Sequence, residues 1–146
     1  MDAQLQADLN AIISRLRKLE PTLQSGPVKR NLAEAAKPLL QAIKAATPVG
    51  TKEHSRYSRG VKVATYKPGN LKRSMQTLRF RRATNAVFVG PKLGGARADG
   101  YYAHIVEGRR PFFAPVVNAM APAVLKAAIE LFKRDVDNFG QRNGFK

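Results

Sequence analysis

The sequence predicts an α+β fold with two N-terminal helices, a small mostly antiparallel sheet carrying a protruding basic arm, and a long C-terminal helix packed on the sheet. Three observations predict it. Apolar residues recur at helical spacing near both ends, short alternating segments lie between them, and a stretch rich in Gly, Tyr and cations interrupts the middle. The length of 146 residues suits one domain with a modest core, so we expect residues 1–146 to form a single domain.

The first 50 residues are predicted to form two helices. Residues 2–19 place Leu and Ile on one stripe, and Pro21 is expected to end this helix before a linker through residues 25–27. A second helix should stop at Thr47-Pro48 and kink at Pro38. Because neither helix can cover the other fully, at least one apolar stripe must cover a sheet or a partner. The second apolar face consists of Leu32, Ala36, Leu39, Leu40 and Ile43.

Residues 51–67 are predicted to form a flexible basic arm. Residues 50–69 contain three Gly, two Tyr and five Lys or Arg, with few bulky aliphatic residues. The alternation over residues 61–66 indicates a weak β-hairpin that becomes ordered on contact with a partner. Loops of this length in compact domains are usually functional or disordered, and we favour a functional arm.

The second half is predicted to contain a hairpin and a long helix. One strand covers residues 77–82 with a basic face, and a second covers residues 86–90. Residues 91–100 are expected to form a flexible loop, and the aromatic segment after them a third short strand or a helical turn. The last helix should run from about Pro115 or Asn118 to Phe139, with Pro122 kinking or starting it, before a frayed tail over residues 140–146.

Composition excludes several classes of protein and site. The chain has no Cys, so disulfides and thiolate metal sites are excluded, and with two His we expect no metal and no cofactor. No run approaches the roughly 18 apolar residues of a membrane span, and the first 20 residues lack the apolar core of a signal peptide. We therefore expect a soluble cytoplasmic product that does not interact with a membrane.

Charge is concentrated in the middle of the chain. The 26 Lys and Arg and 10 Asp and Glu give a net charge of +16, and residues 51–82 hold ten basic residues and one acidic residue. Such a potential attracts polyanions or acidic protein surfaces and depends on salt. A solvated loop with a basic bias is the plainer interpretation.

Ten basic residues are the predicted contacts with DNA or with an acidic partner, two alternatives that the sequence leaves equally open. A strand would space Arg79 and Arg81 about 7 Å apart along one face, comparable to the phosphates of one DNA strand. The ten residues are Lys52, Arg56, Arg59, Lys62, Lys67, Lys72, Arg73, Arg79, Arg81 and Arg82.

The segment Tyr101–Pro115 is predicted to form a corner at an interface with a neighbouring subunit. It places aromatic residues beside Glu107, its one acid, which is expected to pair with Arg109 or Arg110 within the chain or across a subunit boundary. Two Phe most simply anchor the C-terminal helix on the sheet, and one of them could face a neighbour. The predicted interface residues are Tyr102, Glu107, Arg109, Arg110, Phe112 and Phe113.

His104 and Glu107 are the one pair suited to proton transfer, three residues apart. A nuclease using them would be a rival function, but no nucleophile or second base lies nearby in the sequence. A His that holds the corner by a hydrogen bond is the favoured interpretation, and His54 in the basic arm is expected to be solvated. We therefore predict that the chain is not an enzyme.

Several short motifs now stand in a fixed order: AATPVG at residues 45–50, PGNLKRSM at 68–75, VG at 89–90, YAHIVEG at 102–108 and PFFAP at 111–115. This order resembles the tail-completion or head-tail joining family of long-tailed double-stranded DNA phages, a family of minor tail components. The resemblance covers roughly residues 32–132. The chain departs from the family pattern in the inserted basic arm and in Arg109, which stands where the family commonly has Gly-Thr after the Glu.

The resemblance implies a structural subunit of the phage neck that forms a ring, a hexamer or a twelve-fold assembly, around the DNA channel and joins the tail tube to the head connector. Its partners would be copies of itself, the connector, the tail terminator and the tail tube, with weak non-specific contact to genomic DNA. It would reside in the virion after assembly in the host cytoplasm, without catalysis or cofactors. The alternative is a free basic nucleic-acid-binding protein, whose arm would contact duplex DNA or RNA.

Overall fold

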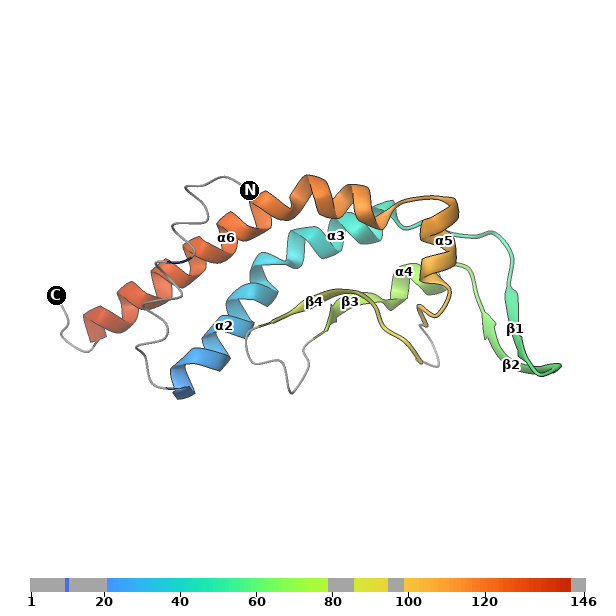
Figure 1. The fold of residues 1–146 in the computed structure, drawn as a ribbon, viewed down its shortest axis with the longest axis horizontal. Coiled ribbons are helices and arrows are strands. Elements are labelled where there is room, and N and C mark those ends of the chain that lie inside the picture. The colour runs from blue at the N-terminus through green and yellow to red at the C-terminus, as the bar shows by residue number, and fades with distance from the viewer. Residues whose placement is uncertain (1–9, 11–20, 79–85, 95–98, 143–146) are drawn as a thin grey trace. The chain divides into compact units, whose positions relative to one another are not determined.

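The computed structural model describes residue 10 and residues 21–78, 86–94 and 99–142, and its elements confirm the α+β class (Figure 1). The chain divides into two compact units, described separately below. Unit 1 comprises Met1–Pro38, Arg79–Phe88 and Met120–Lys146, and unit 2 comprises Leu39–Leu78 and Val89–Ala119. In chain order the elements are α2 (Pro21–Ala35), α3 (Lys37–Ala46), β1 (His54–Ser58), β2 (Val61–Tyr66), α4 (Asn70–Ser74), β3 (Met75–Leu78), β4 (Phe88–Pro91), α5 (Ala103–Arg109) and α6 (Phe113–Arg142).

The N-terminal region differs from its prediction at one proline. The expected linker at residues 25–27 is wrong, because Pro27 lies inside α2. The predicted helix end before Pro21 falls on residues 11–20, which lie outside the described residues. The predicted kink is confirmed: the helix is interrupted at Ala36, two residues before Pro38, and resumes as α3. The helix predicted over residues 2–19 lies outside the described residues.

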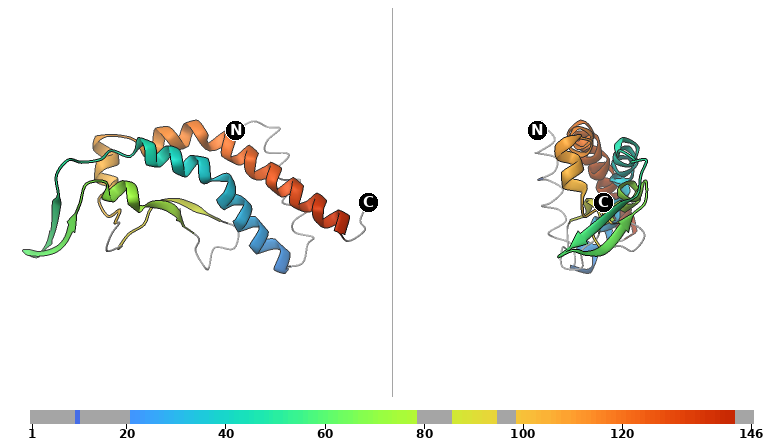
Figure 2. Two further views of the ribbon diagram at one scale, coloured as in Figure 1. Left: turned by 180° about the vertical axis from the view of Figure 1, so that it is seen from behind. Right: turned by 90° about the vertical axis from the view of Figure 1, so that its right-hand side faces the viewer.

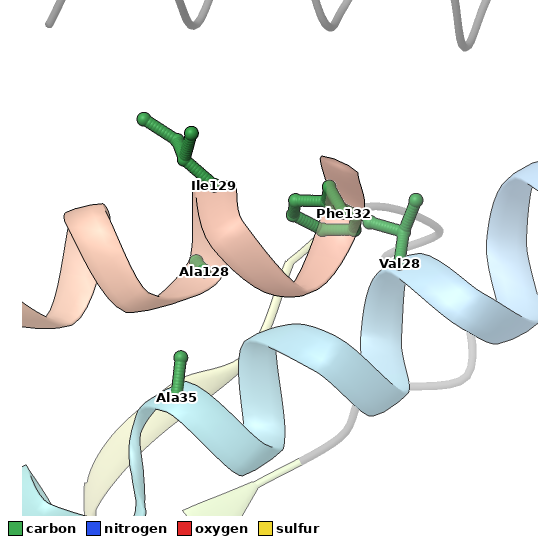
Figure 3. Close-up of a cluster of buried hydrophobic side chains, with 5 residues drawn as sticks. All are labelled: Val28, Ala35, Ala128, Ile129 and Phe132. Carbon is green, nitrogen blue, oxygen red and sulfur yellow. The ribbon is translucent and has the colours of Figure 1, made fainter. Parts of the chain in front are cut away.

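Unit 1 is built on the packing of α2 against the C-terminal part of α6, which run side by side in Figures 1 and 2. Phe132 points toward Val28, and Ala128 lies opposite Ala35, where the two small side chains allow close approach (Figure 3). Ile129 completes the buried cluster. This apolar packing explains why α2 continues through Pro27, since tertiary burial outweighs a local helix-breaking residue.

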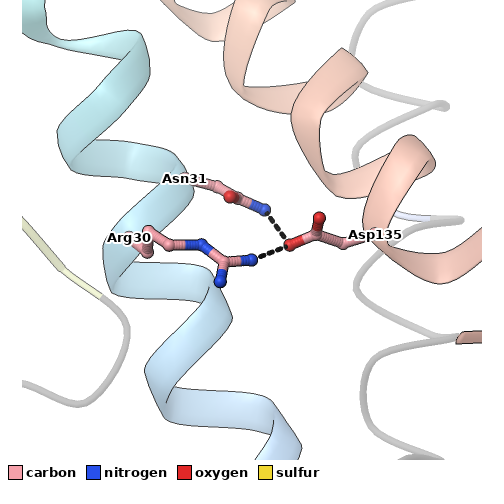
Figure 4. A network of polar contacts seen from close by, with 3 residues as sticks. All are labelled: Arg30, Asn31 and Asp135. Carbon is pink, nitrogen blue, oxygen red and sulfur yellow. Dashed lines mark hydrogen bonds and ion pairs between the residues drawn. The ribbon is translucent and has the colours of Figure 1, made fainter. Parts of the chain in front are cut away.

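A polar contact joins the same two helices at the edge of this core. Arg30 Nη2 and Asn31 Nδ2 both donate to one carboxylate oxygen of Asp135, at 2.6 Å and 2.9 Å (Figure 4). Asn31 is buried, so its bond to Asp135 satisfies a polar group that could not reach water. The pair fixes the register of α2 on α6 where the apolar cluster ends.

The C-terminal helix confirms most of its prediction and corrects its ends. α6 starts at Phe113, so Pro115 lies in its first turn as expected, and it passes Pro122 without ending. It continues to Arg142, and residues 143–146 of the tail that is predicted to fray lie outside the described residues. Within the described residues, Phe113–Phe139 is also long and apolar enough to span a membrane by length and composition, against expectation. Part of its apolar side packs against α2, and 17% of this apolar window is buried.

Unit 2 contains the predicted β-hairpin. β1 and β2 pair antiparallel from His54 opposite Tyr66 to Ser58 opposite Val61. The two connecting residues, Arg59 and Gly60, have φ values of 49° and 79°, which is the left-handed pair of a tight hairpin turn.

The remaining strands and short helices of unit 2 follow the basic hairpin. β3 pairs with β4, as the sequence predicts, so the described strands form two separate two-stranded sheets instead of one sheet of three or four strands. The aromatic segment forms α5, the helical one of its two predicted alternatives. Residues 79–85, which include most of the predicted basic strand, lie outside the described residues.

Candidate interaction surface

A buried carboxylate joins the base of the hairpin to the rest of unit 2. Asp99 is 7% exposed and accepts hydrogen bonds from the Tyr66 hydroxyl at 2.9 Å and from the backbone N–H groups of Gly94 and Tyr101 at 3.0 and 3.1 Å. Burial alone would raise the pKa of Asp99, but these three donors and the charge of Arg56 lower it below its ordinary value. Asp99 is therefore a charged group that holds β2 in place.

The PGN motif at residues 68–70 provides the second attachment to the same segment. Gly69 has a φ of 75°, a conformation that favours glycine, and places Asn70 at the start of α4. The buried Asn70 side chain donates to the Asp99 carbonyl at 2.6 Å and accepts from the Asp99 N–H at 3.2 Å. The side-chain amide of Asn70 therefore pairs with the backbone of Asp99 as the backbone of a neighbouring strand would. This pairing gives the motif a structural role.

Aromatic rings and one guanidinium pack against one another at the base of the hairpin. The Tyr66 and Tyr102 rings pack with centroids 5.1 Å apart at 47°. Arg56 of β1 lies over the Tyr101 ring, 3.6 Å from its centroid. Burial, followed by the bond to Asp99, raises the pKa of Tyr66, although its hydrogen bond with Arg56 opposes the rise. The hydroxyl therefore remains a proton donor to Asp99 at neutral pH.

These elements enclose a cavity of about 510 Å³, the aromatic pocket, between the base of the hairpin, α4 and α5. Its walls are mainly apolar, and its charged residues are all basic. Lys52, Lys67 and Arg110 are exposed at the pocket and form no ion pair within the described part of the chain. The apolar lining residues used below are Pro48, Val49, Leu71, Tyr101, Tyr102 and Val106.

Glu107 has a different role from the predicted one. Its two carboxylate oxygens accept the backbone N–H groups of Phe112, Phe113 and Ala114 at 2.9–3.0 Å, so it caps the start of α6. Burial would raise the pKa of Glu107, but these three bonds lower it. The expected ion pair with Arg109 or Arg110 is not formed within the described chain, because the unbonded N–H groups of the helix start satisfy the carboxylate instead.

Seven of the ten basic residues predicted as contacts are described, and Arg79, Arg81 and Arg82 lie outside the described residues. Arg56 is half-buried on Tyr101 and serves the hairpin base. Arg73 donates to the Pro68 carbonyl at 3.1 Å. The structure brings some of the others to the aromatic pocket and some to the hairpin end or to α4, all of them exposed: Lys52, Lys67, Arg59, Lys62 and Lys72.

The predicted interface residues separate into internal and exposed groups. Phe112 is 5% exposed, which favours its role as an anchor inside the chain, and Phe113 and Tyr102 are half-buried. Arg109 and Arg110 are exposed, and Arg110 lines the aromatic pocket.

Sequence reasoning missed Asp99, Tyr66 and Asn70 as a connected group. One signal pointed to Asp99: an acid directly before a Gly in a strongly cationic chain.

The proposed catalytic pair is poorly arranged for chemistry. His104 is exposed, and both oxygens of Glu107 are already used by backbone N–H groups. Among the described residues no three His, Asp or Glu side chains gather in a way that could hold a metal ion. The features that remain are a surface for contact: an exposed basic hairpin and an apolar pocket with cations at its edge.

A known protein family matches most of the chain. The family described as "Bacteriophage HK97-gp10, putative tail-component" matches residues 10–108, which include the hairpin, the PGN motif and α5. The searches of curated proteins and of solved structures returned no match. Because the match covers more than half of the chain and agrees with the resemblance found in its motifs, the chain belongs to the HK97-gp10-like family of bacteriophage tail components.

Proposed function

We propose that the chain is a ring-forming subunit of the phage neck, a tail-completion or head-tail joining protein that connects the tail tube to the head connector around the DNA channel. Its family makes it a structural tail component and so a protein of the virion. A structural role also makes catalysis unnecessary.

The observation that carries the proposal is the exposure of the hairpin. Tyr57, Val61 and Val63 are 63%, 66% and 50% exposed, although they lie on paired strands. A two-stranded ribbon is marginal in water, and both strands present unpaired edges within the described chain. Contact with a neighbouring subunit would cover these apolar side chains and edges, and a closed ring provides such a neighbour for every copy.

The exposed cations suit a position near the genome. Arg59 and Lys62 lie at the far end of the hairpin, away from any carboxylate partner in the described chain. Contact with phosphates there has to be weak and non-specific, because tight binding would stall the passage of DNA. An acidic surface on an adjacent ring is the other partner these cations fit, and hexamer and dodecamer both remain within the proposal.

The test is the mass of the purified full chain by native mass spectrometry and analytical ultracentrifugation. A closed ring is expected, and serine at Tyr57, Val61 and Val63 should reduce it to monomers without loss of helical signal. A control with serine at Leu93, 66% exposed but outside the hairpin, should still form rings. A chain that stays monomeric at high concentration would contradict the proposal.

Salt titration separates the neck subunit from a free nucleic-acid-binding protein. A ring with feeble duplex affinity at physiological salt is expected from the proposal. A monomer that binds duplex DNA or RNA at micromolar concentration or below would favour the alternative.

A further inference from the structure

The lining of the aromatic pocket favours an occupant with a particular chemistry. Its apolar wall includes Val49 and Tyr101, which are 54% and 46% exposed. Four cationic side chains line it, together with His54, and no carboxylate does. The volume of about 510 Å³ suits several side chains of a docked segment and is too small for a folded domain. The complementary occupant is a short segment that is both apolar and acidic.

Four carboxylates of the described residues already have partners within the chain. The carboxylates of Asp99 and Glu107 are occupied by internal hydrogen bonds, and those of Asp135 and Glu34 by Arg30 and Lys37. The hairpin is excluded as an occupant because it is basic, and bringing it to a basic pocket would be repulsive.

The N-terminal segment, residues 1–14, has the required composition. It contains Asp2 and Asp8 and no Lys or Arg, in a chain whose net charge is +16. At helical spacing Asp8 shares a face with Leu5 and Ile12, because it is three residues from one and four from the other. A helix over these residues would carry Leu and Ile on the same face as a carboxylate.

We infer that residues 1–14 of one copy dock in the aromatic pocket of the next copy, with Leu5 and Leu9 against the apolar wall and Asp8 at the cations Lys67 and Arg110. This inference rests on the proposed ring. Head-to-tail docking of this kind repeats from copy to copy and closes when the rotation per subunit divides the circle. It also gives the N-terminal apolar stripe a partner.

Cysteine cross-linking tests the contact directly, because the chain contains no native Cys. Full-length Leu9→Cys and Val49→Cys proteins are mixed and oxidised, and a disulfide-linked dimer is expected on a non-reducing gel. The matched control replaces Val49→Cys with Val61→Cys, which is 66% exposed on the hairpin and does not line the pocket. This control mixture should give little cross-linked product.

Charge reversal provides a second, independent readout. Asp8→Lys and Lys67→Glu should each weaken ring formation about tenfold or more, because like charges then meet at the contact. The protein carrying both changes should regain most of the lost assembly. Such rescue would not occur if either residue acted only on folding.

The outcomes distinguish this inference from the proposed function. Rings that form without the Leu9–Val49 cross-link would overturn the docking but leave the neck subunit intact, and so would a pocket filled by another phage protein. Cross-linking only within a chain carrying both cysteines would show docking of the segment in its own copy and would overturn the intersubunit contact. A chain that forms no ring would remove both proposals.

Discussion

Replacing Glu107 with Ala tests the cap of α6. A side-chain cap that bonds one N–H stabilises a helix by about 1 kcal/mol, and a negative charge near a helix start adds about 0.5 kcal/mol. Glu107 bonds three N–H groups at 2.9–3.0 Å, one of them that of the buried residue Phe112. We therefore expect Glu107→Ala to lower the free energy of unfolding by about 2–3 kcal/mol.

The assay is urea unfolding followed by circular dichroism, with two comparison proteins. Glu107→Gln keeps one acceptor oxygen and loses the charge, so about half of the loss is expected. Glu130→Ala removes an exposed acid from the middle of α6 and should change stability by less than about 0.5 kcal/mol. If Glu107→Ala is as mild as Glu130→Ala and lowers only ring assembly, the carboxylate serves a subunit contact and the capping argument is refuted.

Three further predictions concern packing and pH. Gly100→Ala should destabilise unit 2 by about 2 kcal/mol, because a Cβ there would overlap the Pro91 side chain, whereas Gly108→Ala meets open space inside a helix and should be neutral or gain about 0.5 kcal/mol in the same urea assay. Phe132→Ala should cost about 3 kcal/mol by opening a cavity in the α2–α6 core, and a melting temperature equal to that of the parent chain would contradict this. The lowered pKa of Asp99 means that its stabilisation is complete above the ordinary carboxyl range and is lost as pH falls below about 4, so thermal melts should show declining stability there, and a flat profile to pH 2 would be inconsistent with it.

Sequence patterns correctly predicted the elements that are determined by residues close together in the chain. The alternation around Val61 and Val63 predicted the hairpin, and Thr47-Pro48 predicted the end of α3. Both depend on residues that are neighbours in sequence, such as the Arg59-Gly60 turn. The same local logic failed at Pro27, since the packing of α2 against α6 involves residues about a hundred positions away.

The sequence predicted the basic character of the candidate surface but not the hydrogen bonds that hold it together. The exposed cations of the hairpin follow from composition alone. Asp99 could not be found that way, because its partners Tyr66 and Asn70 lie 33 and 29 residues earlier in the chain. For Glu107, the nearby Arg109 suggested an ion pair, but helix α6 begins beside it and offers three unbonded N–H groups.

Two of the few carboxylates in this chain accept internal hydrogen bonds, and this affects which contacts its surface favours. Asp99 and Glu107 accept internal hydrogen bonds that stabilise the fold. Neither carboxylate forms an ion pair with a surface cation within the described chain. Arg59 and Lys62 at the hairpin end, and Lys52, Lys67 and Arg110 at the pocket, form no ion pair within the described chain. Mutual repulsion among them disfavours contact between hairpins of neighbouring copies. It favours contacts in which a basic surface of one molecule meets an acidic segment or a phosphate of another, which is the kind of contact that the proposed ring would use.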